Sequence, residues 1–303
     1  MKQKMVVVLG ILVGAVGFFL FAQNQPKTEQ SQEISVVVSF YPLAEFSKEI
    51  GGNLISVTTL TPPGSEPHDF EPNAKDLIAL QKAKLFVYNG AGLEIWLDKI
   101  GADVKAHTSL INSSQGISLH TGNTEGQEMT DPHIWMDPVL ASTQVENIKN
   151  GLIQVDPTHT TVYETNAKAY QQELMTLDHE FFTGLSNCAR HEIVTSHNAF
   201  GYLAQRYGLT VQSVSGLSPD EEPSPKKLAE VVQFIRKQNV KYIFFETLLS
   251  PKLAQTLASE TGTKTIVFNP LEGLTTDEIA QGKTYLSVQR ENLAALKTAL
   301  GCQ

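Results

Sequence analysis

One long segment without helix-breaking residues divides this chain into two parts. Residues 158–183 contain neither proline nor glycine, and about 27 residues of continuous helix reach roughly 40 Å at 1.5 Å per residue. One small α/β lobe does not need a helix of that length. We therefore expect a rigid linker helix over 158–187 between an N-terminal lobe, 34–157, and a C-terminal lobe, 188–303. The alternative is one larger α/β domain that carries a surface helix.

Short apolar runs alternate with helical segments on both sides of this linker. In the first lobe, strands are predicted over 34–40, 54–60 and 85–88, and helices over 44–50, 73–83, 93–100 and 139–155. In the second lobe, strands are predicted over 192–196, 210–214, 242–245 and 264–268, and helices over 199–207, 224–238, 251–260 and about 276–300. The polar stretch 111–130 is expected to be an exposed loop with one short strand at 116–119. Such alternation indicates an α/β fold with a parallel sheet in each lobe and a ligand cleft between the lobes.

The N-terminus indicates export. Lys2 and Lys4 precede residues 5–22, which carry no charge, and a basic start followed by an apolar run is typical of an export signal. We expect 1–22 to be either a cleaved signal peptide or an uncleaved membrane anchor, and 23–33 to be a polar tether. No cysteine precedes Cys188, so we expect no lipid anchor at this end. The body is expected to work outside the cytoplasm, in the periplasm or on the outer face of the cell membrane.

Composition and motifs exclude several classes of protein. The formal net charge is −9, which disfavours nucleic acid as a partner because phosphates require basic surfaces. Walker A, GxGxxG and GxSxG motifs are absent, so an NTPase, a dinucleotide enzyme and a triad hydrolase are disfavoured. The two cysteines, Cys188 and Cys302, exclude a four-cysteine zinc module. In an oxidising compartment we expect them to form a disulfide, the alternative being two buried thiols.

Four loops carry candidate metal ligands. Ligands of open α/β sheets bind beyond the carboxyl ends of the strands. Proline-framed loops hold His68 and His133, while His197 and Glu272 follow predicted strands of the second lobe. Three histidines and one carboxylate match a tetrahedral metal site in the cleft. Zn²⁺ favours imidazole nitrogen, whereas Mn²⁺ prefers a larger share of oxygen.

Three further residues compete for roles at this site. Glu246 directly follows the apolar run 242–245 and is a rival to Glu272 as the fourth ligand. Asp137 is interpreted either as a helix cap or as a hydrogen-bond partner of a ligand histidine. His120, in the polar loop, is a candidate for transient metal uptake.

The motifs around these ligands resemble those of a known family. The motifs resemble those of the zinc/manganese solute-binding proteins of ABC transporters, in the segments 67–72, 131–138, 195–202 and 269–274. The resemblance is greatest to the zinc-type members, such as ZnuA and AdcA. The resemblance covers about 34–303 and implies the ligands His68, His133, His197 and Glu272. Manganese-type members place a carboxylate where His197 stands, so the resemblance favours zinc. Many zinc-type members carry a His-rich insert, whereas 111–130 offers only His120.

The resemblance implies a function as well as a site. It implies an extracytoplasmic, monomeric protein that captures Zn²⁺, delivers it to the membrane permease of an ABC transporter and catalyses no reaction. A manganese-uptake protein is the alternative within the same class. A zinc-dependent hydrolase with Glu272 as general base is the alternative from another class, and a surface adhesin that reuses the fold is a third.

Overall fold

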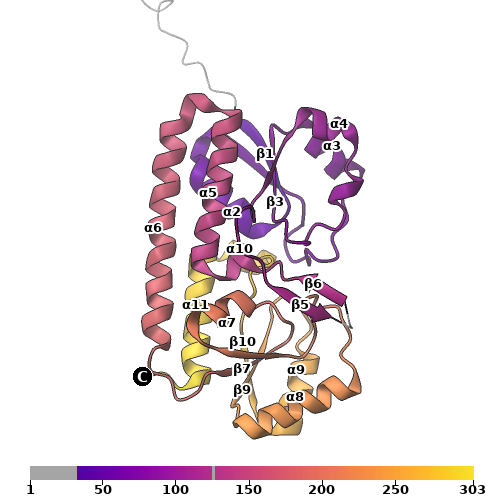
Figure 1. Ribbon diagram of the computed structural model, residues 1–303, viewed down its shortest axis with the longest axis vertical. Coiled ribbons are helices and arrows are strands. Elements are labelled where there is room, and N and C mark those ends of the chain that lie inside the picture. The colour runs from indigo at the N-terminus through magenta and orange to yellow at the C-terminus, as the bar shows by residue number, and fades with distance from the viewer. Residues whose placement is uncertain (1–32, 125–126) are drawn as a thin grey trace, which may run out of the picture. The chain divides into compact units, whose positions relative to one another are not determined.

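The computed structural model describes residues 33–124 and 127–303, which form two parallel four-stranded sheets with helices around them (Figure 1). The predicted signal or anchor, 1–22, and all but the last residue of the tether, 23–33, lie outside the described residues. Within the described residues, no helix is both long and apolar enough to cross a membrane.

The two sheets repeat one strand order. The first consists of β1 (Ile34–Val38), β2 (Ile55–Thr59), β3 (Leu85–Tyr88) and β4 (Ser109–Asn112), in the order β2-β1-β3-β4. The second consists of β7 (Glu192–Thr195), β8 (Thr210–Ser213), β9 (Tyr242–Phe245) and β10 (Lys264–Val267), in the order β10-β9-β7-β8. Read from the other edge, this is again second, first, third and fourth strand. The prediction of two parallel-sheet lobes is confirmed, and each sheet has a switch point between its first and third strands, where ligands of such sheets bind.

Helices cover both sheets and connect the lobes. The first lobe contains α2 (Tyr41–Gly51), α3 (Ala74–Lys82), α4 (Ala102–His107) and α5 (Pro138–Val155). The second contains α7 (Gly201–Tyr207), α8 (Pro225–Gln238), α9 (Lys252–Thr261), α10 (Thr276–Ala280) and α11 (Tyr285–Leu300). The long helix α6 (Thr160–Leu185, 26 residues) lies inside the predicted linker and packs against α5, α2 and α11. Figure 1 shows α6 running beside α5 at the first lobe and beside α11 at the second.

The apolar side of α6 explains why it packs against both lobes. Its buried residues recur every three or four positions, which places them along one face of the helix; they are Tyr163, Ala167, Tyr170, Leu174, Leu177, Phe181 and Leu185. The Tyr170 ring lies 5.8 Å from that of Phe46 on α2, and Phe46 in turn lies 5.0 Å from Tyr285 on α11. One apolar cluster thus includes side chains of both lobes and of the linker.

Two covalent or polar connections reinforce this junction. Cys188, shortly after α6, forms a disulfide with Cys302, shortly after α11, so the predicted bond is confirmed. The half-buried carboxylate of Glu45 on α2 accepts the backbone N–H of Tyr285 at 2.7 and 2.8 Å. It also accepts hydrogen bonds from the hydroxyls of Tyr41 and Tyr170. Burial raises the pKa of Glu45.

Several predicted elements differ from those observed. The predicted helix 93–100 contains only a 3₁₀ turn, Leu97–Lys99, because the Glu94 carboxylate accepts the backbone N–H groups of Asn89 and Gly90 and holds the segment as a loop. The predicted final helix is broken between α10 and α11, where Gly282 has a φ of 71° and Thr284 caps α11.

The polar stretch 111–130 was also only partly described by the sequence. The strand predicted at 116–119 is wrong, because Gly116 belongs to a turn and residues 117–119 form no regular secondary structure. Instead, β5 (Thr121–Thr124) and β6 (Gln127–Thr130) form an antiparallel hairpin. Neither α4 nor β4, the fourth strand of the first sheet, was predicted from the sequence.

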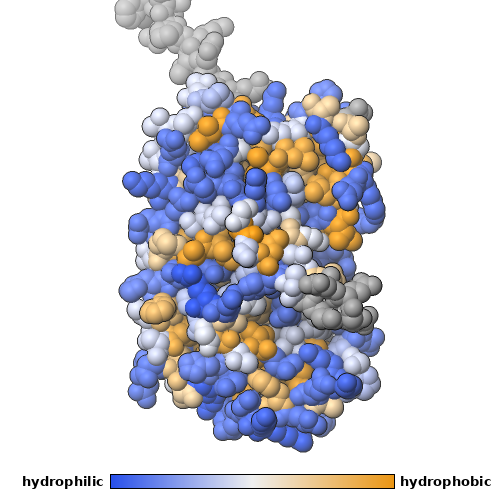
Figure 2. Space-filling model, viewed as in Figure 1, coloured by the Kyte–Doolittle hydropathy of each residue, from blue (hydrophilic) through white to orange (hydrophobic). Residues whose placement is uncertain are grey.

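Hydrophilic side chains cover most of the face drawn in Figure 2, and hydrophobic ones gather over the first lobe and in a band across the middle. The exposed apolar residues of the first lobe include Leu77 and Ile78 on α3 and Ile95 in the loop after β3.

Candidate metal centre

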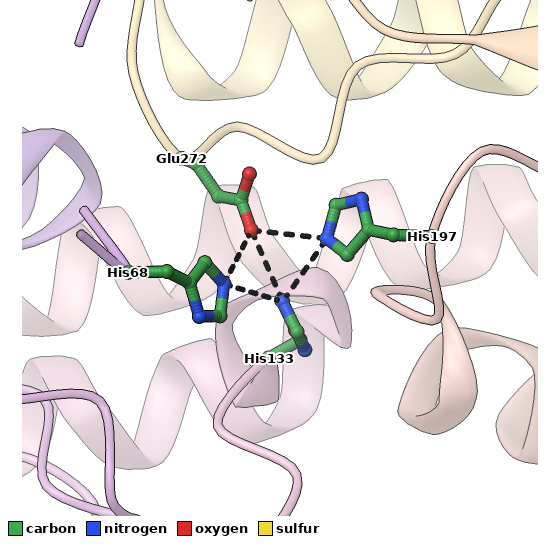
Figure 3. A group of neighbouring side chains, drawn as sticks. All are labelled: His68, His133, His197 and Glu272. Carbon is green, nitrogen blue, oxygen red and sulfur yellow. Dashed lines mark hydrogen bonds and ion pairs between the residues drawn. The ribbon is translucent and has the colours of Figure 1, made fainter. Parts of the chain in front are cut away.

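The four predicted ligands come from four loops and meet at one point (Figure 3). His68 lies in the loop after β2 and His197 directly after β7, while Glu272 follows β10. His133 follows β6 and precedes a 3₁₀ turn, Ile134–Met136. The proline residues on either side of His68 and His133 restrict the backbone of both loops. His68, His197 and Glu272 thus approach the centre from the carboxyl ends of parallel strands.

Five of the six distances between the four donor atoms are short and nearly equal, and all four atoms lie within 4.8 Å of one another. His68 Nε2 lies 3.2 Å from His133 Nε2 and 3.0 Å from Glu272 Oε1. His133 Nε2 lies 3.0 Å from the same oxygen. His197 Nε2 lies 3.4 Å from His133 Nε2 and 3.2 Å from Glu272 Oε1. Bonds of about 2.0–2.1 Å in a tetrahedral zinc site give edges of about 3.3–3.4 Å, so the observed spacing matches that of a small tetrahedral cation.

The centre is buried on most sides. The side chains of His133, His197 and Glu272 are fully buried, whereas that of His68 is 11% exposed. An ion at this point would be enclosed by protein and reached by solvent mainly past His68.

Two carboxylates outside the group orient two of the imidazoles. Asp131 Oδ1 accepts both the backbone N–H of His133, at 3.0 Å, and its Nδ1–H, at 2.8 Å. Glu246 Oε1 accepts the Nδ1–H of His197 at 2.7 Å. Because a carboxylate accepts the proton of each Nδ1, the opposite Nε2 is the nitrogen that presents a lone pair to the centre once the ring is neutral.

The comparisons with known proteins agree with this arrangement. Residues 36–299 match the family model ZnuA, described as "Zinc-uptake complex component A periplasmic". The chain belongs to this family.

Two relatives of the family show how far the likeness extends. The chain is 40% identical over 309 residues to the "High-affinity zinc uptake system protein ZnuA" of Bacillus subtilis (strain 168), covering 96% of this chain and 97% of the relative. It is 38% identical over 299 residues to the "Zinc-binding lipoprotein AdcA" of Streptococcus pneumoniae (strain ATCC BAA-255 / R6), covering 95% of this chain. The match spans only 60% of that AdcA.

Solved structures of the family share the fold. Zn(II)-bound AdcA from Streptococcus pneumoniae superposes with a TM-score of 0.79 at 39% identity, covering 89% of this chain and 58% of that one. The laminin binding protein of Streptococcus agalactiae, described as a bifunctional protein with adhesin and metal transporting activity, superposes with a TM-score of 0.81 at 38% identity. That match covers 89% of this chain and all of the other.

In this family member, the charges around the centre favour protons on two histidines when no metal is bound. Burial alone would lower the pKa of His197, but Glu246 and Glu272 outweigh it and raise that pKa well above its ordinary value. Burial alone would also lower the pKa of His133, but Asp131 and Glu272 outweigh this effect and raise that pKa above its ordinary value. Burial lowers the pKa of His68.

The carboxylate of the group is ionised for the complementary reason. Burial would raise the pKa of Glu272, but His197 and the hydrogen bonds from the three imidazoles hold it well below its ordinary value. Positive charge thus collects around one carboxylate, whether it is carried by protons or by a divalent cation.

The structure places the two candidate carboxylates differently. Glu272 lies in the group, whereas Glu246 contacts the outer nitrogen of His197. The interpretation of Asp137 as a histidine partner is wrong: its carboxylate caps α5 by accepting the Val139 N–H at 2.8 Å. Asp131, to which the sequence assigned no role at this site, is the hydrogen-bond partner of His133 instead.

Sequence reasoning also missed one buried acid beside the centre. Both carboxyl oxygens of Glu66 are buried and have no hydrogen-bond partner among the described residues. Burial and the charge of Glu272 raise the pKa of Glu66 to about 9, so it holds a proton at neutral pH. Its place two residues before His68 is the signal that identifies it.

Proposed function

We propose that this protein captures Zn²⁺ outside the cytoplasm through His68, His133, His197 and Glu272, and delivers it to the permease of an ABC transporter. The observation that carries the proposal is the convergence of three Nε2 atoms and one carboxylate oxygen within 4.8 Å of one another, with five of their six separations at 3.0–3.4 Å. Lone pairs that face one another at such distances repel unless a cation or protons lie between them.

The donor set supports zinc over manganese. Three imidazole nitrogens and one carboxylate form a set typical of Zn²⁺, while Mn²⁺ is better served by carboxylate, carbonyl and water oxygen. The family description and the printed names of the relatives refer to zinc, which supports the same assignment.

The position of Glu272 supports transport over hydrolysis. A catalytic zinc keeps one coordination position open for water, and a general base would have to stand away from the metal ligands. Glu272 Oε1 instead lies 3.0 Å from two of the imidazole nitrogens. Four protein donors leave no position for an activated water, so we propose that no reaction is catalysed.

The location and partner follow from the family. The family description places its members in the periplasm and in a zinc-uptake complex, which supports a place outside the cytoplasm and a membrane permease as partner. A disulfide between Cys188 and Cys302 fits an oxidising compartment. We propose a monomer that does not bind nucleic acid.

Metal analysis tests the proposal directly. The protein is purified without added metal and without chelating resins, and its metal content is measured by elemental analysis. We expect about one zinc per chain in the wild type and little in His133→Ala. Manganese or iron in place of zinc would refute the metal assignment, and an unchanged zinc content in His133→Ala would refute the site.

A further inference from the structure

A tyrosine of the second lobe contacts the segment that carries His133. Tyr202, on α7, donates its hydroxyl hydrogen to the carbonyl oxygen of Asp131 at 2.8 Å and accepts the backbone N–H of His120 at 2.9 Å. Its side chain is buried, with 2% of the residue exposed. The one hydroxyl therefore satisfies two backbone groups that lie eleven residues apart in the sequence.

Those two groups mark the base of the β5–β6 hairpin. The Asp131 N–H donates to the His120 carbonyl oxygen at 2.9 Å, which closes the hairpin at this end. The Tyr202 ring stacks on the His120 imidazole, with the ring centres 4.1 Å apart and the planes inclined by 9°. Tyr202 thus fixes both strands of the hairpin base through its ring and its hydroxyl.

Asp131 connects this contact to the metal centre. Its Oδ1 holds His133 through both the backbone N–H and Nδ1. A Cβ atom added to Gly201 would lie only 2.8 Å from the Oδ2 atom of Asp131. The absence of a side chain at Gly201, the residue before Tyr202, therefore leaves room for the carboxylate. Gly201 thus lies against the carboxylate of Asp131, and Tyr202 holds its main-chain carbonyl group by a hydrogen bond.

We infer that Tyr202 is a positioning residue for the metal ligand His133, acting through Asp131; this inference rests on the proposed function. Tyr202 lies five residues after His197 in the sequence, so the same segment of the second lobe carries one ligand and orients another. The contact sets the separation between these two imidazoles across the cleft. Burial raises the pKa of Tyr202 to about 12, and its hydroxyl remains a donor at physiological pH.

The test compares two tyrosines of one helix. Tyr202→Phe keeps the aromatic ring on His120 but removes the hydroxyl partner of the Asp131 carbonyl oxygen and of the His120 N–H. Tyr207→Phe is the matched control, because its hydroxyl donates to Asp178 at 2.8 Å, outside the centre. We expect Tyr202→Phe to weaken zinc binding by about tenfold, the lower end for loss of an orienting partner, and Tyr207→Phe to change it less than twofold. Competition with a chromogenic chelator measures both.

Two further measurements separate positioning from a loss of stability. In Co²⁺-loaded protein, the visible absorption bands report the geometry of the donors, and we expect them to change in Tyr202→Phe only. In a double-mutant cycle, Asp131→Asn and Tyr202→Phe should weaken zinc binding by less than the product of the single effects, since both act on His133. Gly201→Ala, which pushes on the Asp131 carboxylate, should weaken binding even if Tyr202→Phe fails to fold.

The inference is overturned if Tyr202→Phe lowers the melting temperature as Tyr207→Phe does but retains wild-type zinc affinity and cobalt spectrum. Strictly multiplicative effects in the double-mutant cycle would overturn it as well, as would full affinity in Gly201→Ala. Wild-type protein that binds no zinc would instead refute the proposed function, on which the inference depends.

Discussion

The Glu246 carboxylate oxygen Oε1 accepts two hydrogen bonds from one residue, His197: the backbone N–H at 3.3 Å and the imidazole Nδ1–H at 2.7 Å. The two residues follow the neighbouring strands β9 and β7, at the switch point of the second sheet. The imidazole is therefore fixed in place and in tautomer by a carboxylate that does not enter the centre.

This contact predicts that Glu246 and Glu272, two acids of the second lobe, contribute differently to zinc affinity. Glu272→Gln removes a charged donor of the centre, and we expect it to weaken zinc binding by at least the ~10–100-fold range that applies to orienting partners. Glu246→Gln should weaken binding less, and His197→Ala more than either, because imidazole is the stronger zinc donor. Parallel titrations against a chromogenic chelator measure all three. Glu180→Gln, whose carboxylate pairs with Arg290, serves as the control. A greater loss in Glu246→Gln than in Glu272→Gln would move the fourth ligand to the other loop.

Two aspartates that flank His133 should separate affinity from stability. Asp131→Asn weakens the partner of His133 Nδ1, so zinc affinity should fall about tenfold or more. Asp137→Ala removes the cap of α5 and should lower the free energy of unfolding by about 1 kcal/mol, with zinc affinity within about twofold of wild type. Urea unfolding of the metal-free proteins and chelator competition measure the two effects. The assignment is wrong if the two variants exchange these phenotypes.

Zinc affinity should depend on pH through the histidines. The pKa values of His133 and His197 are raised in the metal-free protein, so these groups hold protons at pH values above the ordinary histidine pKa of about 6.5. Zinc must displace these protons, so affinity should already fall with decreasing pH above about 6.5, and fall more steeply at lower pH, where His68, whose pKa is lowered by burial, takes up a proton as well. Calorimetry in buffers of different ionisation enthalpy should find more than one proton released per zinc bound. A proton count near zero between pH 5 and 7 would argue against three histidine ligands.

The disulfide should contribute to stability without contributing to binding. Cys188 and Cys302 are 114 residues apart, and the chain-entropy model gives about 4–5 kcal/mol for a loop of this size. The double variant Cys188→Ser/Cys302→Ser should therefore unfold at a clearly lower urea concentration. Its zinc affinity should match that of wild type, because neither cysteine belongs to the centre. Wild-type resistance to urea in the double variant would contradict the prediction.

The lobes, the linker and the residues of the group could be predicted because each has a local cause. Apolar runs and proline-framed loops mark strand ends in the sequence, and the absence of proline and glycine from 158–183 marks α6. The topology of parallel sheets then brings strand ends to one edge. Residues as distant as His68 and Glu272 could therefore be assigned to one cleft.

The partners of the ligands could not be predicted in the same way. Asp131 and Asp137 stand on either side of His133 and both precede a proline, so their sequence contexts are alike. In the structure the Asp131 carboxylate accepts the Nδ1–H of His133 while its carbonyl oxygen accepts the Tyr202 hydroxyl, whereas the Asp137 carboxylate accepts the Val139 N–H of α5. Contacts between segments distant in sequence decided the matter, and local preferences do not contain them.

The aromatic cluster of Phe46, Tyr170 and Tyr285 joins α2, α6 and α11, and it has a thermodynamic consequence. A protein whose lobes share apolar side chains exposes little new surface when its ligand arrives or leaves. Heat-capacity changes on binding scale with the apolar area that is buried, so the heat capacity of the loaded and free forms should differ little. Calorimetric enthalpies of zinc binding should then vary only weakly with temperature and report mainly on metal–donor bonds and displaced protons.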